Sequence, residues 1–89
     1  MLKITRLHQF KRDTKRIKKR GTELTELKEL LECLVNGGPP PRKYRCHKLT
    51  GNWVGRYECH VASDVLIIYR MTDTELLLER IGTHSDLFR

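Results

Sequence analysis

The segment Val65-Leu66-Ile67-Ile68-Tyr69 is a continuous apolar run, rich in side chains branched at Cβ. Such a run is typical of a central strand that is buried on both faces. It belongs to an expected strand at residues 65–71, and the neighbouring segments alternate or carry turn residues. Further strands are expected at residues 44–49, 54–61 and 75–81. Because the connections between the last three strands are short, we expect an antiparallel meander.

The N-terminal half has helical periodicity. Residues 2–5 suit a short strand, and apolar side chains then recur at gaps of three or four along two segments separated by Gly21. The first stripe comprises Leu7, Phe10, Thr14 and Ile17, and the second comprises Leu24, Leu27, Leu30, Leu31, Leu34 and Val35. Thr5 and Thr22 are expected to cap the two helices. A Gly-Gly-Pro-Pro-Pro break at residues 37–41 ends the second helix.

The order strand, helix, helix and then three or four strands predicts an α+β fold. In this fold the N-terminal strand and the helical hairpin pack on one face of a mainly antiparallel sheet, and the other face stays partly open. A single domain is expected over residues 1–89, near the small end of the range that folds without metal or disulfides. Residues 83–89 are expected to add a short helical turn.

Charge suggests an anionic partner. The formal net charge is +7, and basic residues are concentrated in the first helix. Nucleic acid, an acidic protein or a lipid surface would all fit. The candidates for contacts with RNA phosphates are Lys15, Arg16, Lys18 and Lys19, which are expected to face solvent. The alternative is a solvated helix face with no target.

Composition also bears on the compartment. No apolar run approaches the roughly 18 residues of a membrane span, and no signal peptide is visible. We therefore expect a cytoplasmic protein that makes no membrane contact. Cys33, Cys46 and Cys59 are odd in number and show no Cys-x-x-Cys spacing, so all three are expected to be reduced.

The candidate catalytic residues are His47, His60, His84 and Asp64. In an extended strand alternate residues share a face, so Arg56, Glu58 and His60 would project together from the open face. Neighbouring strands would bring the histidines within several ångströms of one another, as acid–base catalysis requires. The alternative is that each histidine is an ordinary surface or core residue.

RNA cleavage needs few groups, because the substrate supplies the 2′-hydroxyl nucleophile. A base takes the proton of this hydroxyl, an acid protonates the leaving 5′-oxygen, and a cation stabilises the phosphorane. Histidine, with an ordinary pKa of about 6.5, suits the first two roles. Arginine suits the third, because its planar guanidinium matches phosphate oxygens. Such chemistry requires no metal ion or cofactor.

Two further sets of residues leave alternatives open. The dipeptides Cys46-His47 and Cys59-His60 superficially resemble zinc ligand pairs. Adjacent strand residues point to opposite faces, so all four would converge only if both dipeptides lay in loops. Among the aromatic residues, Trp53 fits packing better, whereas Phe88 lies near a terminus where its ring could stack on a nucleobase.

The sequence resembles the YafQ branch of the RelE toxins along essentially its whole length. The resemblance is carried by three segments: His47-Lys48-Leu49-Thr50-Gly51-Asn52-Trp53, Arg56-Tyr57-Glu58-Cys59-His60-Val61 with Asp64-Val65-Leu66-Ile67-Ile68-Tyr69, and Glu79-Arg80-Ile81-Gly82-Thr83-His84-Ser85-Asp86-Leu87-Phe88. This spaced set is far more specific than any one motif within it.

The resemblance implies a RelE-like microbial RNase fold and an mRNA endoribonuclease that cuts in the ribosomal A site and leaves a 2′,3′-cyclic phosphate. It implies an acidic, DinJ- or RelB-like antitoxin, and operator DNA as a partner of the toxin–antitoxin complex only. The motif positions matching His47, His60, Asp64, His84 and Phe88 are active-site residues in the family. His84 is expected to act as the general acid. Either His60 together with Asp64, or His47, is expected to act as the general base or to contact the phosphate. Arg80 is expected either to contact the phosphate or to support the sheet.

Two other functions remain open on sequence grounds. A RelE-fold protein that has lost catalysis would serve only as a binding module for RNA or a partner protein. The intact set of three histidines and Asp64 argues against this alternative. A small DNA-binding protein would use the basic helix, but no convincing helix-turn-helix unit follows it.

Overall fold

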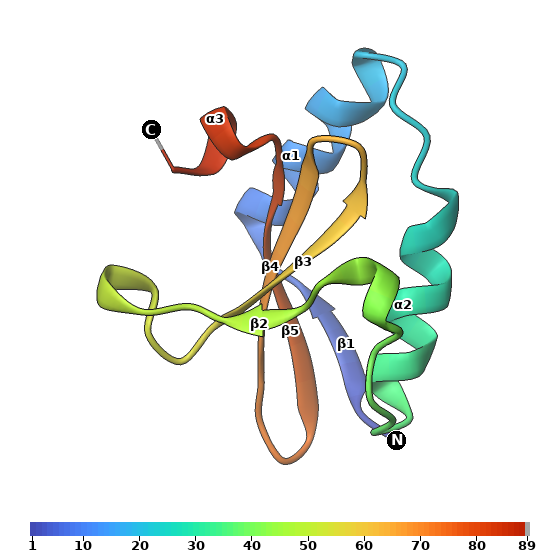
Figure 1. Ribbon diagram of the computed structural model, residues 1–89, viewed down its shortest axis with the longest axis vertical. Helices are drawn as coiled ribbons and strands as arrows, with labels where there is room; N and C mark the ends of the chain where they lie inside the picture. The colour runs from blue at the N-terminus through green and yellow to red at the C-terminus, as the bar shows by residue number, and fades with distance from the viewer. Residues whose placement is uncertain (89) are drawn as a thin grey trace.

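The computed structural model describes residues 1–88. A five-stranded sheet has the order β1-β5-β4-β3-β2, in which β1 (Lys3–Arg6) runs parallel to β5 (Glu75–Gly82). The other pairs of the sheet are antiparallel. β4 (Val65–Met71) pairs with β5 on one side and with β3 (Tyr57–Ala62) on the other, and β3 pairs with β2 (His47–Lys48). The expected meander is therefore confirmed. β1 and β2 are the two edge strands of this sheet (Figure 1).

Two helices follow β1 and cover one face of the sheet. α1 (His8–Lys19) and α2 (Thr25–Val35) run in opposite directions, as Figure 1 shows. Their apolar stripes meet every second residue of β4 in one core. This core comprises Phe10, Leu30, Leu31, Leu34, Val35, Tyr44, Cys59, Val61, Val65, Ile67, Tyr69, Leu76, Leu78 and Ile81. The expected helical hairpin on one face is confirmed.

The opposite face carries a smaller apolar cluster. Leu66 and Ile68 of β4 pack there with Leu87 of the last helix, α3 (His84–Leu87). Leu49, Trp53 and Phe88 border this cluster and are only partly buried. Trp53 belongs to a 3₁₀ turn, Gly51–Trp53, and a second such turn, Arg42–Tyr44, precedes β2. Within residues 1–88 no helix contacts β3 on this face, where His60 stays partly accessible and Glu58 is buried.

The expected helix caps are wrong. Thr5 lies within β1, and its hydroxyl donates to Oε2 of Glu75 at 2.6 Å, so it is not available to α1. The N-cap of α1 is Leu7, which has extended backbone and no side-chain cap. α2 begins at Thr25, three residues after Thr22. In contrast, the short C-terminal helix was expected, and its Thr83–Asp86 capping box is present.

The expectation of three reduced cysteines is also wrong. Cys46 and Cys59 form a disulfide, and Cys33 is the free cysteine of the described chain. The physical reason is the β2–β3 register: His47 lies opposite Glu58, so the next antiparallel pair is Cys46 and Cys59. Their side chains point to the helix-covered face, whereas His47 and His60 do not.

None of the helices described over residues 1–88 is long and apolar enough to cross a membrane.

Candidate active site

A buried carboxylate lies between two histidines on the open face. Oε1 of Glu58 lies 3.2 Å from Nε2 of His47 and 3.8 Å from Nε2 of His60. Glu58 and His60 alternate on β3, and the two-residue strand β2 brings His47 opposite Glu58. Glu58 is only 7% exposed. The open face thus combines two imidazoles with a carboxylate that has few other partners.

Hydrogen bonding distinguishes these two histidines. Nδ1 of His47 lies 3.1 Å from the carbonyl oxygen of Arg45, and its Nε2 faces Glu58. Both ring nitrogens of His47 therefore face oxygen acceptors. Nδ1 of His60 instead lies 3.2 Å from Nη2 of Arg45. Because a guanidinium can only donate, this nitrogen must be unprotonated, and His60 is neutral with its proton on Nε2.

The surroundings of His60 also favour its neutral form. Burial lowers its pKa below the ordinary 6.5, and the nearby Arg45 guanidinium lowers it further, outweighing the opposing effect of Glu58. Positive charge on His47 and on His84 acts in the same direction. His47 and His84 are therefore both close enough to His60 to act on its pKa.

His84 approaches this patch from the C-terminal helix. It is the first residue of α3 and is exposed. Its ring lies 5.0 Å from that of Phe88, measured between centroids, and Phe88 meets Trp53 edge-on at 5.7 Å. The guanidinium of Arg56 lies 5.9 Å from the centroid of the Trp53 ring. A shallow hollow of about 470 Å³ is lined by Asn52, Trp53, Arg56, Leu87 and Phe88.

Arg56 is held in place by a hydrogen-bonded ion pair with Glu79 of β5. Its Nε donates to Oε1 of Glu79 at 2.8 Å, and Nε of Arg70 donates to Oε2 at 2.7 Å. Burial alone would raise the pKa of Glu79, but the hydrogen bonds from Arg56 and Arg70 outweigh burial and lower it. Two guanidiniums sharing one carboxylate leave a net positive charge beside the hollow.

Several predicted site residues lie apart from this patch. Asp64 is exposed in the β3–β4 turn with a φ of 57°, and within residues 1–88 it makes no hydrogen bond or ion pair with a histidine. Nε of Arg80 pairs with Oδ2 of Asp13 at 2.7 Å. Arg16 pairs with Asp13 and is only partly exposed, with 39% of its side chain accessible, whereas Lys15, Lys18 and Lys19 are exposed as expected.

Two residues at the site were not chosen from the sequence. Glu58 was placed on the correct face by its alternation with His60, but no role was given to it. Arg45 follows a 3₁₀ turn in the left-handed backbone region, with a φ of 47°. Nothing in the local sequence signals that conformation, because left-handed backbone is uncommon for arginine.

Comparison with known proteins identifies the family. Residues 2–89 match the family described as "Bacterial toxin of type II toxin-antitoxin system, YafQ". The chain is also 41% identical over 81 residues to "mRNA interferase toxin YafQ" of Escherichia coli (strain K12), covering 90% of this chain and 88% of that protein. This chain belongs to the YafQ family of toxins. The resemblance carried by the three histidine-containing segments is thereby confirmed.

Solved YafQ structures share the fold. The crystal structure of YafQ from E. coli strain BL21(DE3) has a TM-score of 0.91 and 37% identity to this chain, and 100% of both chains is covered. YafQ in the crystal structure of the E. coli DinJ–YafQ complex gives a TM-score of 0.89 at 38% identity, again over 100% of both chains. The α+β fold expected from the sequence is that of the YafQ structures.

Proposed function

We propose that this member of the YafQ family is an mRNA endoribonuclease that acts on the ribosome. The observation that carries the proposal is the patch in which His47 and His60 flank a buried carboxylate and His84 lies beside Phe88, next to a hollow lined by Arg56 and two aromatic rings. The patch contains the groups that 2′-hydroxyl attack requires. The name of the E. coli relative, an mRNA interferase toxin, supports the same reaction class.

In the proposed reaction the 2′-oxygen forms a bond to phosphorus and the bond from phosphorus to the 5′-oxygen breaks. His60, held neutral, accepts the proton of the 2′-hydroxyl after Arg45 leaves Nδ1 to bind the phosphate. His84 donates a proton to the departing 5′-oxygen. The products are a 2′,3′-cyclic phosphate and a free 5′-hydroxyl. Imidazole and guanidinium groups perform every step, so neither a metal ion nor a cofactor is invoked.

The remaining groups of the patch bind substrate. The imidazole ring of His47 can donate a hydrogen bond to a phosphate, and the guanidinium of Arg56 offers it positive charge. Phe88 and Trp53 offer ring faces and edges for nucleobase stacking, as single-stranded RNA recognition often uses. Asp64 and Arg80 lie outside this arrangement. A contact from Asp64 to substrate would need RNA that extends to the β3–β4 turn, and an RNA contact by Arg80 would compete with Asp13.

The exposed lysines of α1 supply a nonspecific attachment to ribosomal RNA. Replacing Lys15, Lys18 and Lys19 with Gln should weaken ribosome binding. The slope of the logarithm of the binding constant against the logarithm of the salt concentration should become shallower by about 0.7 for each lost phosphate contact. Arg16 is left unchanged because it pairs with Asp13. An unchanged affinity and slope would show that the lysines form a solvated face without a target.

A cognate antitoxin is the second proposed partner, as DinJ is for YafQ in the E. coli complex. A groove of about 730 Å³ runs between α1, α2 and β1. Its floor includes the apolar side chains of Ile4, Phe10, Leu27 and Leu31, and its rim carries Arg6, Lys11, Lys18 and Lys28. This combination suits an acidic amphipathic segment. We further propose a cytoplasmic location, and operator DNA as a partner of the toxin–antitoxin complex only.

The test is induced expression followed by mapping of mRNA 5′ ends, with and without the candidate antitoxin. New 5′ ends inside reading frames should appear on induction and disappear when the antitoxin is co-expressed. The same ends should be produced by purified protein on programmed ribosomes in the presence of EDTA at a concentration that leaves ribosomes intact. Ribosome binding without new 5′ ends would instead indicate the catalytically inactive binding module.

A further inference from the structure

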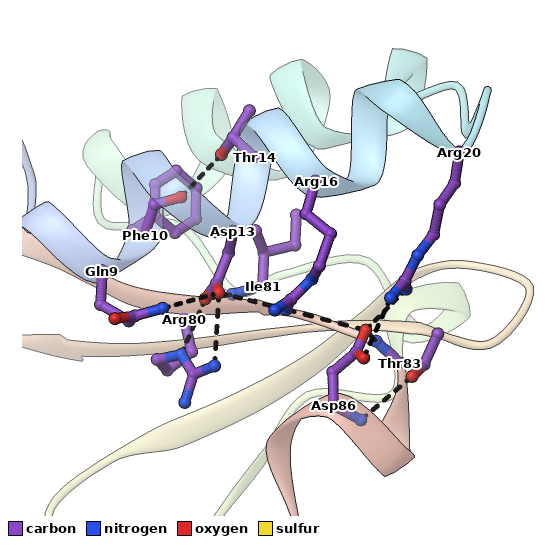
Figure 2. Close-up of polar contacts among 10 residues, drawn as sticks. All are labelled: Gln9, Phe10, Asp13, Thr14, Arg16, Arg20, Arg80, Ile81, Thr83 and Asp86. Atoms are coloured by element: carbon purple, nitrogen blue, oxygen red, sulfur yellow. Dashed lines mark hydrogen bonds and ion pairs between the residues drawn. The ribbon is translucent and has the colours of Figure 1, made fainter.

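A chain of ion pairs connects α1 to the segment that carries His84. Figure 2 shows two carboxylates, Asp13 and Asp86, with arginine side chains on either side of them. The chain begins at Asp13, the one acidic residue of α1, which is fully buried. It ends at Asp86, two residues after His84 and two before Phe88. We use the name α1–α3 clamp for the set of five residues Asp13, Arg16, Arg20, Thr83 and Asp86.

Asp13 holds α1 against the edge of β5. Its Oδ2 accepts from the backbone N–H of Ile81 at 3.1 Å and from Nε of Arg80 at 2.7 Å. β1 pairs with β5 only from Glu75 to Leu78, so this N–H lies beyond the paired segment. Oδ1 of Asp13 accepts from Nη2 of Arg16 at 3.2 Å. The Asp13 carboxylate therefore accepts the N–H that a neighbouring strand would otherwise accept at this edge of β5, and it also holds Arg16 in place.

Arg16 lies between the two carboxylates. Its Nη2 is 3.2 Å from Oδ1 of Asp13 and 3.8 Å from Oδ2 of Asp86. Its Nε is buried and has no protein partner among the described residues. Gly82 permits this approach, because a Cβ there would lie 3.0 Å from Oδ2 of Asp86 and 3.3 Å from Nη2 of Arg16. The side chains of Arg16 and Asp86 therefore meet over Gly82 of β5, where a larger residue would separate them.

Asp86 completes the clamp and caps α3. Nη1 and Nη2 of Arg20 donate to its two oxygens at 2.8 and 3.3 Å, and the backbone N–H of Thr83 donates to Oδ2 at 3.0 Å. The hydroxyl of Thr83 accepts from the backbone N–H of Asp86 at 3.1 Å. The hydrogen bond from Arg20, and then those from Thr83, hold the pKa of Asp86 well below its usual value.

α3 needs such support because it is only one turn long. Isolated helices shorter than about 12–15 residues are marginal in water. Leu87 is the buried residue of α3, and its C-cap Phe88 is only partly buried beside Trp53, so α3 has few apolar contacts. We propose that Asp86, held by Arg20 and Arg16, is the positioning residue that sets where His84 and Phe88 lie on the open face. This role rests on the proposed function, in which His84 donates a proton to the 5′-oxygen.

The proposal divides the basic residues of α1 into two groups. Arg16 and the C-cap residue Arg20 pair with Asp86, so their loss should lower the rate of cleavage on bound substrate. Lys15, Lys18 and Lys19 face solvent, so their loss should weaken ribosome binding. Sequence alone places all five in one basic run, and only their contacts separate them.

The test compares Asp86→Asn and Arg20→Gln, singly and together, with Arg12→Gln as the control. Arg12 is an exposed residue of α1 that makes no ion pair within residues 1–88, and its replacement changes the net charge as Arg20→Gln does. Cleavage is measured on programmed ribosomes as kcat and KM. The position of α3 is measured separately by NMR, through the ring-current shift that Phe88 imposes on the His84 imidazole protons.

We expect each clamp variant to lower kcat by about ten- to a hundredfold, since small misplacements of a reacting group have effects of this order. KM should stay within about twofold, the double variant should be no slower than the slower single variant, and the His84 shifts should move toward free values. Arg12→Gln should match the wild type. Circular dichroism checks that Arg20→Gln, a surface change, leaves the fold intact.

Three outcomes would overturn the clamp. Unchanged kcat and unchanged His84 shifts would show that α3 holds its position without Asp86. A rise in KM alone would make Arg20 a direct RNA contact. Strictly additive effects of the two single changes would show that the two residues act independently. If the wild type cleaves no RNA, the proposed function fails, but the His84 shifts still decide whether the clamp positions α3.

Discussion

The two faces of the sheet use alternate residues of the same strands for different purposes. On β3, Cys59 and Val61 enter the core beneath the helices, whereas Glu58 and His60 reach the open face. The covered face is apolar and closed, so its side chains contribute mainly to stability. The open face holds only a small apolar cluster and, beside it, the charged and aromatic groups of the candidate site. Substitutions on the two faces should therefore separate loss of fold from loss of chemistry.

The largest effect is expected on the open face, from His84→Ala. A 5′-alkoxide is a poor leaving group, so loss of its proton donor should slow single-turnover cleavage by about 10²–10⁴-fold. The free energy of unfolding should barely change, because His84 is exposed. His8→Ala is the matched control, since His8 is an exposed histidine at the start of α1. A folded His84→Ala protein that binds ribosomes and cuts at the wild-type rate would remove His84 from the role of acid.

The covered face should respond in the opposite way. Leu30 of α2 is fully buried in the main core, so Leu30→Ala should lower the free energy of unfolding by about 2–5 kcal/mol. The folded fraction should keep its kcat. Val54→Ala, at a side chain that is 70% exposed, should change stability by less than about 0.5 kcal/mol. Denaturant titrations measure both, and a fall in the kcat of folded Leu30→Ala protein would show that the two faces are coupled.

The disulfide joins β2 to β3 on the covered face, at the edge of the sheet. It lies on the covered side, directly behind His47 and His60, and closes a loop between residues 13 apart in sequence. Loops of about 15 residues correspond to about 3 kcal/mol of stabilisation. Reduction, or Cys46→Ala with Cys59→Ala, should lower the unfolding free energy by up to about that amount. Cys33→Ala is the control. Unchanged stability after complete reduction would mean that the short β2–β3 pairing holds without the bridge.

The accuracy of the sequence-based expectations follows the range of the interactions. Alternation along β3 and the apolar run of β4 identified both faces, because side-chain direction in a strand is a local property. The disulfide was missed because the register of the two-residue strand β2 is set by its partner. The pairing of Arg80 with Asp13 was missed because 67 residues separate them along the chain, whereas the pairing of Arg16 with Asp13 is local and was available from the helical spacing. A lone acid within a basic helix was the available signal.

The smallest expected effect, and the most specific, concerns the charges around His60. Its pKa is lowered first by burial and then by Arg45, while Glu58 raises it. Arg45→Gln should therefore raise the pKa of His60, and Glu58→Gln should lower it further, as read by NMR titration of the imidazole protons. The pKa of His60 in the folded protein lies below the ordinary 6.5 of the unfolded chain, so unfolding near and below pH 6.5 takes up a proton at His60. The contribution of neutral His60 to the free energy of unfolding is therefore present above pH 6.5 and is lost as the pH falls. Arg45→Gln should reduce that loss. If both substitutions shift the pKa in the same direction, altered burial rather than charge controls His60, and the assignment of Arg45 as the group that keeps this imidazole neutral is wrong.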